Sequence, residues 1–283
     1  MSVKITPCLE PSNQNITEYF GYFCDPINVT FNFAFGCDNS TGTYKVVAYR
    51  SRYIYDQLAA EVRVINMGDD VWRNIESFPV IPFCYDSVYY GAYKYVYLSG
   101  ALNWLAIHNF ICYDCNDITV DQFVIVSLDL ETETYNQYIM PHGFDEVPPK
   151  EPTIGVLRGC LCFSYSYKET DFVIWEMKEF GVEDSWTQLL KVSYHNLLID
   201  YDFSDPRIKF VFQLMPLFLS EDGDTLILES NQESQTIILY NRRDNRAERA
   251  RITASKATTD NTTSDHVDLY YANDYVESLV PSF

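Results

Sequence analysis

Apolar and polar residues alternate along most of this chain in short runs, and turn residues separate the runs. The clearest runs form pairs around a tight turn, as in YVYLSGALNWLAI around Gly100 and TIGVLRGCLCFSYSY around Gly159. Successive side chains of a strand point to opposite faces, so this period of two predicts β-hairpins. Evidence for helix is thin: SRYIYDQLAAEV at residues 51–62 could form a helical turn or two, but it lies between strong strand patterns.

The hairpins group into four units of about four strands each. The units cover residues 32–75, 95–141, 153–192 and 212–252. Four short strands are the content of one propeller blade. The sequence therefore predicts an all-β fold, a β-propeller-like (kelch-like) array of four-stranded blades that is either closed or incomplete.

A large aromatic side chain follows the acidic turn of each of the first three units. These side chains are Trp72, Tyr135 and Trp186, which lie 63 and 51 residues apart along the chain. Unequal steps suit strands of fixed length joined by loops of variable length. In a radial array, a ring at the start of the outer strand fills the gap that widens toward the periphery, and we expect that role here.

The two ends of the chain differ from the repeating units. We expect residues 1–20 to be a poorly ordered N-terminal segment and residues 21–283 to form one domain. The Thr- and Ser-rich stretch before Asp265 predicts a loop. After it, HVDLYYANDYVESLV at residues 266–280 predicts a final strand that completes another blade.

Composition limits the classes of partner. The 283 residues are 47% hydrophobic, which is enough for a large folded core, and the formal net charge is −20. Such an acidic chain is a poor match for nucleic acid and a better one for a basic protein partner. No run of about 18 apolar residues and no apolar signal segment is found, so we expect no membrane contact and a cytoplasmic or nuclear protein.

Three kinds of chemistry were weighed against simpler explanations. Cys112 and Cys115 with His108 give only three zinc ligands where a structural site normally needs four, so we expect no metal and no cofactor. Acidic clusters raise the alternative of a propeller glycoside hydrolase, but solvated turns are the favoured explanation because turn chemistry accounts for each cluster without a pocket. The clusters are Asp200, Asp202 and Asp205, and Asp129, Glu131 and Glu133. No nucleophile or phosphate-loop motif is found, and we predict a protein that is not an enzyme.

Two sets of residues are candidates for binding a partner protein. Tyrosines gather in CYDSVYYGAYKY and HNFICYDCND, and tyrosine offers a large contact area at low entropic cost. The candidates are Tyr89, Tyr90, Tyr93 and Tyr113, with cover for an edge strand as the simpler reading. Arg242 and Arg243 begin a basic group that continues with Arg246, Arg249 and Arg251, and a solvated hairpin face would explain it equally well.

The motifs of these units resemble a known plant family. FAFGCDNSTGTYKVVAYR, VRVINMGDDVWRNIESFPV, LSGALNWLAI, VSLDLETETY, GVLRGCLCFSY, FVIWEMKEFGVEDSWTQL and the terminal YVESLV are similar, in the same order and spacing, to the F-box associated (type 1) domain. This domain occurs in F-box proteins of flowering plants, including S-locus F-box and F-box/kelch-like proteins. The resemblance runs from about Gly21 to the C-terminus.

The resemblance implies a role in protein recognition. Members of the family are substrate receptors of cullin-RING ubiquitin ligases: an F-box binds a Skp-type adaptor, and the associated domain captures the protein to be ubiquitinated. In the S-locus branch that target is a pistil ribonuclease. The sequence shows no F-box, so we do not expect it to bind a Skp-type adaptor. The alternative is a stand-alone interaction module or a truncated paralogue with no coupling to a ligase.

Overall fold

The computed structural model describes residues 31–54, 57–82, 95–108, 113, 115–209, 211–232 and 236–251. Within these residues the chain forms four antiparallel sheets of four strands each, and in each sheet the strands lie in chain order or its reverse. The prediction of an all-β, propeller-like array of four-stranded blades is therefore confirmed. The predicted N-terminal segment, residues 1–20, and the predicted final strand, residues 266–280, lie outside the described residues.

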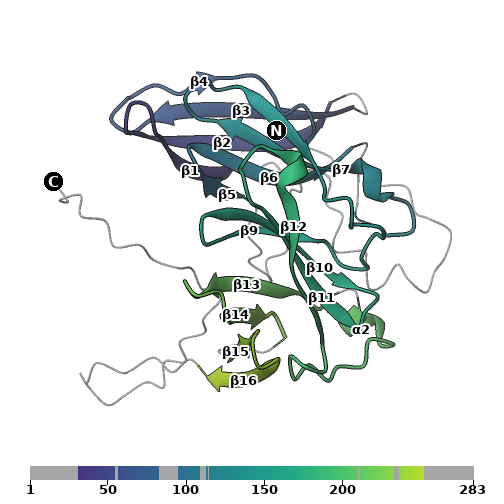
Figure 1. Cartoon of the computed structure of the whole chain (residues 1–283). Helices are drawn as coiled ribbons and strands as arrows, with labels where there is room; N and C mark the ends of the chain where they lie inside the picture. The colour runs from purple at the N-terminus through teal and green to yellow at the C-terminus, as the bar shows by residue number, and fades with distance from the viewer. Residues whose placement is uncertain are drawn as a thin grey trace, which may run out of the picture.

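Each sheet corresponds to one unit of the sequence pattern (Figure 1). Sheet 1 contains β1 (Asn32–Asp38), β2 (Thr43–Ile54), β3 (Gln57–Asn66) and β4 (Arg73–Asn74). Sheet 2 contains β5 (Val96–Leu98), β6 (Ala101–Ile107), β7 (Phe123–Asp129) and β8 (Tyr135–Ile139). Sheet 3 contains β9 (Thr153–Leu157), β10 (Cys160–Tyr167), β11 (Asp171–Met177) and β12 (Trp186–Ser193). Sheet 4 contains β13 (Leu214–Leu219), β14 (Thr225–Ser230), β15 (Thr236–Asn241) and β16 (Arg246–Arg251). Short helical turns lie between strands: η1 (Val120–Gln122), η2 (Glu183–Ser185) and α2 (Pro206–Lys209).

The described residues 51–54 and 57–62 form strand, where the sequence had allowed a helical turn or two. The β2–β3 ladder continues outward from Tyr49↔Val62 to Ile54↔Gln57. This pairing gives the backbone groups hydrogen-bond partners on the neighbouring strand, which a helical turn in the same segment would interrupt.

The inner hairpins turn where the glycines indicated. Ser99 and Gly100 have φ values of 52° and 84°, and Arg158 and Gly159 have φ values of 50° and 74°. Two central residues with positive φ are typical of the tight hairpin turn whose twist matches that of the flanking strands. Glycine at the second position adopts this conformation without the strain that a Cβ atom would add.

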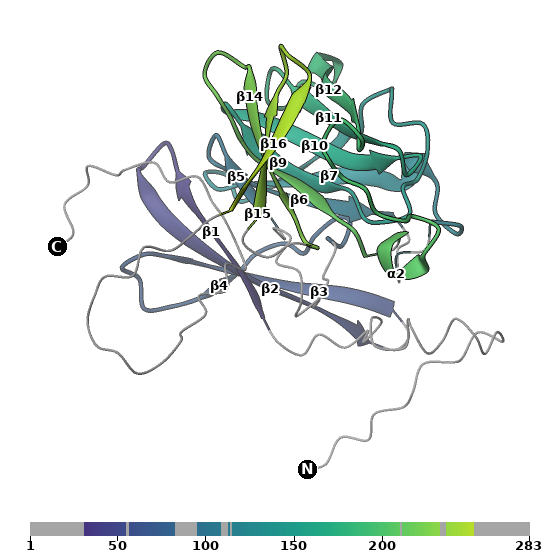
Figure 2. The same ribbon diagram turned by 90° about the horizontal axis from the view of Figure 1, so that it is seen from below.

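Three hydrophobic cores hold neighbouring sheets together. Val47 and Tyr49 of sheet 1 pack with Leu102 and Trp104 of sheet 2, and equivalent cores lie between sheets 2 and 3 and between sheets 3 and 4. Sheets 2 and 3 are thus covered on both faces, which explains why all seven residues of β6 are buried. Sheet 1 packs against sheet 2 on one face only, and Figures 1 and 2 both place it at one end of the array.

Two of the three predicted rings join neighbouring sheets at the periphery. Tyr135 opens β8, and its hydroxyl donates a hydrogen bond of 3.0 Å to the carbonyl of Glu76 in the segment that follows sheet 1. Trp186 opens β12, and its Nε1–H donates to the carbonyl of Ile139 in β8 at 3.1 Å. Each ring thus reaches back to the preceding sheet. Trp72 lies just before β4 in the first sheet and is 39% exposed.

Candidate protein-interaction site

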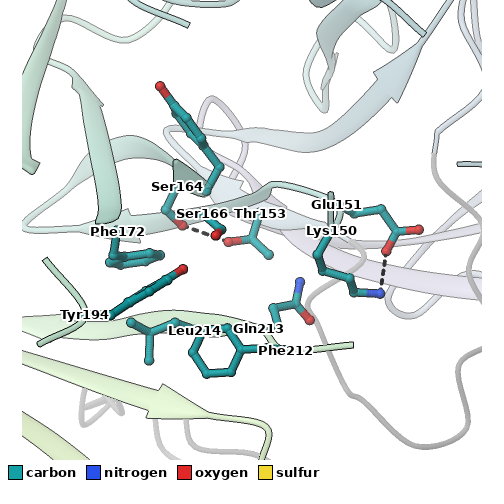
Figure 3. A pocket seen from close by; sticks show the side chains of 11 residues that line it. Lys150, Glu151, Thr153, Ser164, Ser166, Phe172, Tyr194, Phe212, Gln213 and Leu214 are labelled. Carbon is teal, nitrogen blue, oxygen red and sulfur yellow. Dashed lines mark hydrogen bonds and ion pairs between the residues drawn. The ribbon is translucent and has the colours of Figure 1, made fainter. Parts of the chain in front are cut away.

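A small hollow lies between sheets 3 and 4, where three connections meet. Residues of the β8–β9 and β12–β13 connections line the hollow, and the ends of β10 and β11 that flank the third connection, β10–β11, complete the lining. Figure 3 shows hydroxyl and amide side chains on one side of it and aromatic rings on the other. Because the connections come from parts of the chain up to about sixty residues apart, only the packing of the sheets brings them together.

Some polar side chains that line the hollow form hydrogen bonds with one another. The Oγ atoms of Thr153 and Ser164 lie 2.8 Å apart and share a hydrogen bond. Nearby, the Lys150 ammonium donates to the Glu151 carboxylate at 3.0 Å. Gln213 places a largely buried carboxamide between these two pairs (Figure 3).

Tyr194 belongs to the aromatic wall and brings a hydroxyl to the hollow. Its ring stacks on Phe203 with centroids 5.1 Å apart and meets the edge of Phe212 at 5.4 Å. Tyr194 is only 4% exposed, and within the described residues its hydroxyl makes no hydrogen bond of regular geometry. Burial raises the pKa of Tyr194, and the Ser166 side chain acts in the opposite direction. The hydroxyl is therefore neutral and available as a donor.

The size of the hollow limits what can enter it. Its free volume is about 10 Å³, which is roughly the space that one water molecule requires. An unpaired buried hydroxyl costs about 1–3 kcal/mol. A water molecule, or a small polar group presented by a partner, would therefore be stabilised by the Tyr194 hydroxyl.

Three of the six carboxylates weighed for glycoside hydrolysis, Asp129, Glu133 and Asp202, serve turns and sheet contacts. Asp202 accepts from the backbone and side chain of Ser204, and Asp129 accepts from the backbone of its own turn. Glu133 accepts from Arg73 of β4 and from Lys45 of β2, and it thereby joins sheet 2 to sheet 1. The Arg73 hydrogen bond is the main cause that lowers the pKa of Glu133. These carboxylates have local structural roles.

The cysteine motif can be followed only in part. His108 and Cys115 are described, whereas Cys112 lies outside the described residues. In the part of the chain that the structure describes, no group of three or more His, Cys, Asp or Glu side chains is placed to hold a metal ion.

Of the four candidate tyrosines, the structure describes Tyr113, whereas Tyr89, Tyr90 and Tyr93 lie outside the described residues. The Tyr113 ring packs edge-on against Phe123 with centroids 6.4 Å apart, and its hydroxyl donates to the Pro148 carbonyl at 2.7 Å. Burial raises the pKa of this hydroxyl. The side chain thus anchors its segment to sheet 2, and contact with a partner stays a prediction.

The candidate arginines lie between β15 and β16 and differ sharply from each other. The Arg242 guanidinium donates to the carbonyls of Gly223 in sheet 4 and Leu189 in β12, both at 2.8 Å. It therefore joins sheet 4 to sheet 3. Arg243 has a side chain that is 74% exposed and pairs with Asp224. Arg243 is the more accessible of the two to a partner.

Sequence reasoning did not identify the residues of the hollow. Tyr194 and Gln213 belong to none of the family motifs, Ser164 lies in a motif that was interpreted only as a hairpin, and the three residues are separated by up to 49 positions. Tyr194 lies just beyond the unit at residues 153–192, and nothing in the local sequence indicated a polar surrounding for it.

None of the helices that the structure describes has the length and apolar character needed to cross a lipid bilayer.

Comparisons with known proteins agree with the arrangement of the sheets. The family model of the F-box associated beta propeller domain matches residues 11–282. An F-box/kelch-repeat protein of Arabidopsis thaliana is 29% identical over 164 residues, which are 56% of this chain and 39% of that protein. The F-box protein CPR1 of Arabidopsis thaliana is 27% identical over 216 residues, which are 70% of this chain and 47% of that protein. The matched parts are thus less than half of either relative. With four propeller-like sheets and a family match over nearly its whole length, this chain belongs to the F-box associated beta propeller domain family.

Proposed function

We propose that this chain is a target-recognition domain that binds another protein, as the substrate-receptor part of an SCF-type ubiquitin ligase does. Membership of the F-box associated family and the similarity to two F-box proteins support the proposal. The protein acts by binding and carries out no chemical step itself.

The observation that carries this proposal is the buried hydroxyl of Tyr194, which makes no hydrogen bond of regular geometry within the described residues and faces a hollow lined by the β8–β9 and β12–β13 connections. In a propeller, connections of this kind vary in length while the strands are held by the cores. A target that inserts a small polar side chain gains a hydrogen bond there and removes an unsatisfied group. Tyr89, Tyr90, Tyr93, Tyr113 and Arg243 remain proposed contacts around such a target.

A matched pair of tyrosine variants tests the recognition site. Tyr194→Phe removes only the hydroxyl, and because this group is unpaired we expect an unchanged or slightly raised stability. Tyr240→Phe is the control, since its hydroxyl donates to Asn245 at 2.8 Å, away from the hollow. A true target should bind Tyr240→Phe as tightly as the unmodified chain and bind Tyr194→Phe more weakly. A target that binds both variants equally would place recognition elsewhere.

The charge of the chain indicates a basic target. A net charge of −20 attracts cationic proteins over a Debye length and raises their association rate at low ionic strength. We expect the association rate to fall as salt is raised from 0.05 to 0.5 M, a range of ~10-fold in ionic strength, with little change in the dissociation rate. An association rate that is insensitive to salt would contradict a basic target.

Binding of a Skp-type adaptor tests whether this chain is coupled to a ligase. We expect the purified chain not to retain a Skp-type adaptor, because no F-box is recognisable in its sequence, whereas an F-box protein used as a positive control should retain it. Retention would assign the coupling step to this chain. Target binding without retention would favour the stand-alone interaction module.

A further inference from the structure

The β10–β11 turn bends sharply without a glycine. Lys168 and Glu169 are its central residues, with φ values of 50° and 56°. The Thr170 N–H closes the turn by donating to the Tyr167 carbonyl at 3.1 Å. Among the described residues, this is the one place where two successive non-glycine residues have positive φ. Because both residues carry a Cβ atom, the turn keeps a strained conformation that a glycine would relieve.

Contacts outside the turn hold this conformation. The Lys168 N–H donates to the Glu146 carboxylate at 2.7 Å, and the Glu169 carboxylate forms an ion pair with Lys209 of α2. In proteins, backbone strain that the surrounding structure maintains in this way is concentrated at ligand sites. The side chains at this turn are therefore candidates for contact with a ligand.

Two ammonium groups converge on one ring beside this turn. The Nζ atom of Lys191 in β12 lies 3.8 Å from the centroid of the Tyr167 ring, and that of Lys168 lies 4.9 Å from it. The Tyr167 ring packs against the core between sheets 2 and 3, and the Tyr165 ring lies 6.5 Å away. Both lysines are exposed. The ring thus holds two positive charges close together at the surface, where they repel each other.

These two lysines differ from the other four that the structure describes. Each of the four forms an ion pair with a carboxylate, and they are Lys45, Lys150, Lys178 and Lys209. Lys168 and Lys191 form no ion pair with any described residue. A hydrogen bond with Tyr167 is the main cause that raises the pKa of Lys168, and Asp145 and Glu146 add a weaker attraction. Two ammonium groups without a carboxylate at ion-pair distance are thus placed together on a chain whose net charge is −20.

We propose that Tyr167, Lys168 and Lys191 form a binding site for an oxyanion, a carboxylate or phosphate group on a side chain of the partner protein. An anion between two ammonium groups offsets their repulsion and accepts charge-assisted hydrogen bonds from both. The ring positions the ammonium groups in advance, which lowers the ordering cost of binding. The partner follows from the proposed function, whereas the anion site rests on the geometry of this turn.

The site and the net charge act over different distances. The net charge of −20 favours a basic partner during the approach and repels free anions. The lysine pair acts only at contact, where it matches a single acidic or phosphorylated side chain. A basic partner with one such side chain fits both, so the site contributes selectivity and not a faster encounter.

Titration of the full chain with inorganic phosphate tests the site. The lysines are reductively methylated with ¹³C, which retains their charge, and the methyl signals are assigned by replacing one lysine at a time with arginine. At constant ionic strength, the NMR signals of Lys168 and Lys191 should shift together and saturate with one dissociation constant. The Lys178 signal is the control and should not saturate, because this ammonium group already pairs with Glu176.

Matched variants locate the bound anion. Lys191→Gln should abolish the saturable shift of Lys168, and Lys168→Gln should abolish that of Lys191, whereas Lys178→Gln should leave both unchanged. Circular dichroism confirms that each variant is folded. Acetate in place of phosphate distinguishes the two sources: a weaker saturable response to acetate assigns the site to a phosphorylated side chain, and an equal response assigns it to a carboxylate.

The strain at the turn gives a second test. Lys168→Gly should bind no phosphate and should melt at an unchanged or higher temperature, because glycine adopts positive φ without strain. A lower melting temperature would show that the Lys168 side chain serves the fold, and it would overturn the proposal.

The phosphate titration can also overturn the proposal directly. Absence of a saturable shift at Lys168 and Lys191, or an equal shift at Lys178, would show that no site exists. Because phosphate is tested without a target, this result is independent of the hollow. A Tyr194→Phe variant that binds its target normally would refute recognition at the hollow and leave the anion site in place.

Discussion

Replacing Arg242 with alanine separates a structural role of this arginine from a role in binding. The side chain donates two hydrogen bonds of 2.8 Å, one to Gly223 of its own sheet and one to Leu189 of the preceding sheet. The variant removes both bonds and leaves two carbonyls without this donor. If Arg242 served only a partner, the free protein would be unaffected.

The expected loss can be worked from these contacts. A hydrogen bond to a charged group contributes about 1.5–3 kcal/mol to the free energy of unfolding, so two such bonds would contribute at least about 3 kcal/mol if water did not compete for them. Because Arg242 is only partly buried, water replaces part of each bond, and we expect a loss of about 2 kcal/mol. Arg242→Lys keeps the charge but lacks the planar fork that reaches both carbonyls, so we expect an intermediate loss.

Urea unfolding followed by tryptophan fluorescence measures this loss, with Arg243→Ala as the matched control. Arg243 carries an exposed ion pair with Asp224, and its removal should lower the free energy of unfolding by less than about 0.5 kcal/mol. Equal unfolding midpoints for the two alanine variants, at equal slopes, would refute the assignment of Arg242 as a link between sheets 3 and 4.

Two further predictions address packing and acid stability. A Cβ atom at Gly143 would lie 2.3 Å from Cζ2 of Trp175, so Gly143→Ala should lower the free energy of unfolding by about 1–3 kcal/mol in thermal melts. Gly155→Ala is the control and should not lower it, because a Cβ atom at Gly155 would meet nothing within 4 Å. Equal melting temperatures for the two variants would contradict this prediction. Hydrogen bonds from Ser40 lower the pKa of Asp38 from its ordinary value of 3.8 to about 2, so the ionised carboxylate stabilises the fold above pH 3.8 and that contribution is lost as pH falls toward 2. Ser40→Ala should reduce this acid-dependent fall in urea midpoints between about pH 4 and 2, and an identical pH profile would count against it.

The repeat of hairpins was predictable because its causes are local. Alternation along a strand and a glycine with positive φ at the turn depend on neighbouring residues, and both are visible around Gly100 and Gly159. The aromatic positions were predictable for a similar reason, since Tyr135 and Trp186 open the outer strand of their own hairpins. The sequence was ambiguous at residues 51–62, and pairing with a neighbouring strand decided the conformation of the residues that the structure describes there.

The candidate site shows where local patterns stop being informative. Arg242 and Arg243 are adjacent in the sequence and carry the same charge, yet one joins two sheets and the other faces solvent. Tyrosine is a residue type that is common in contact surfaces, but the ring of Tyr113 packs against Phe123. The direction in which a side chain points depends on what the neighbouring sheet places beside it, and that neighbour is distant in the sequence.

The sequence by itself determined that this protein is an array of four-stranded sheets, and its motifs identified the family. The strand period, the turn residues and the order of the motifs depend on residues that are close together along the chain. Only the tertiary structure decided that Tyr194, Gln213 and Ser164 meet around one hollow and that, within the described residues, Phe33, Phe35 and Tyr44 of sheet 1 are exposed. Both depend on how whole sheets stack, and stacking is set by the sum of many contacts between residues far apart in the chain.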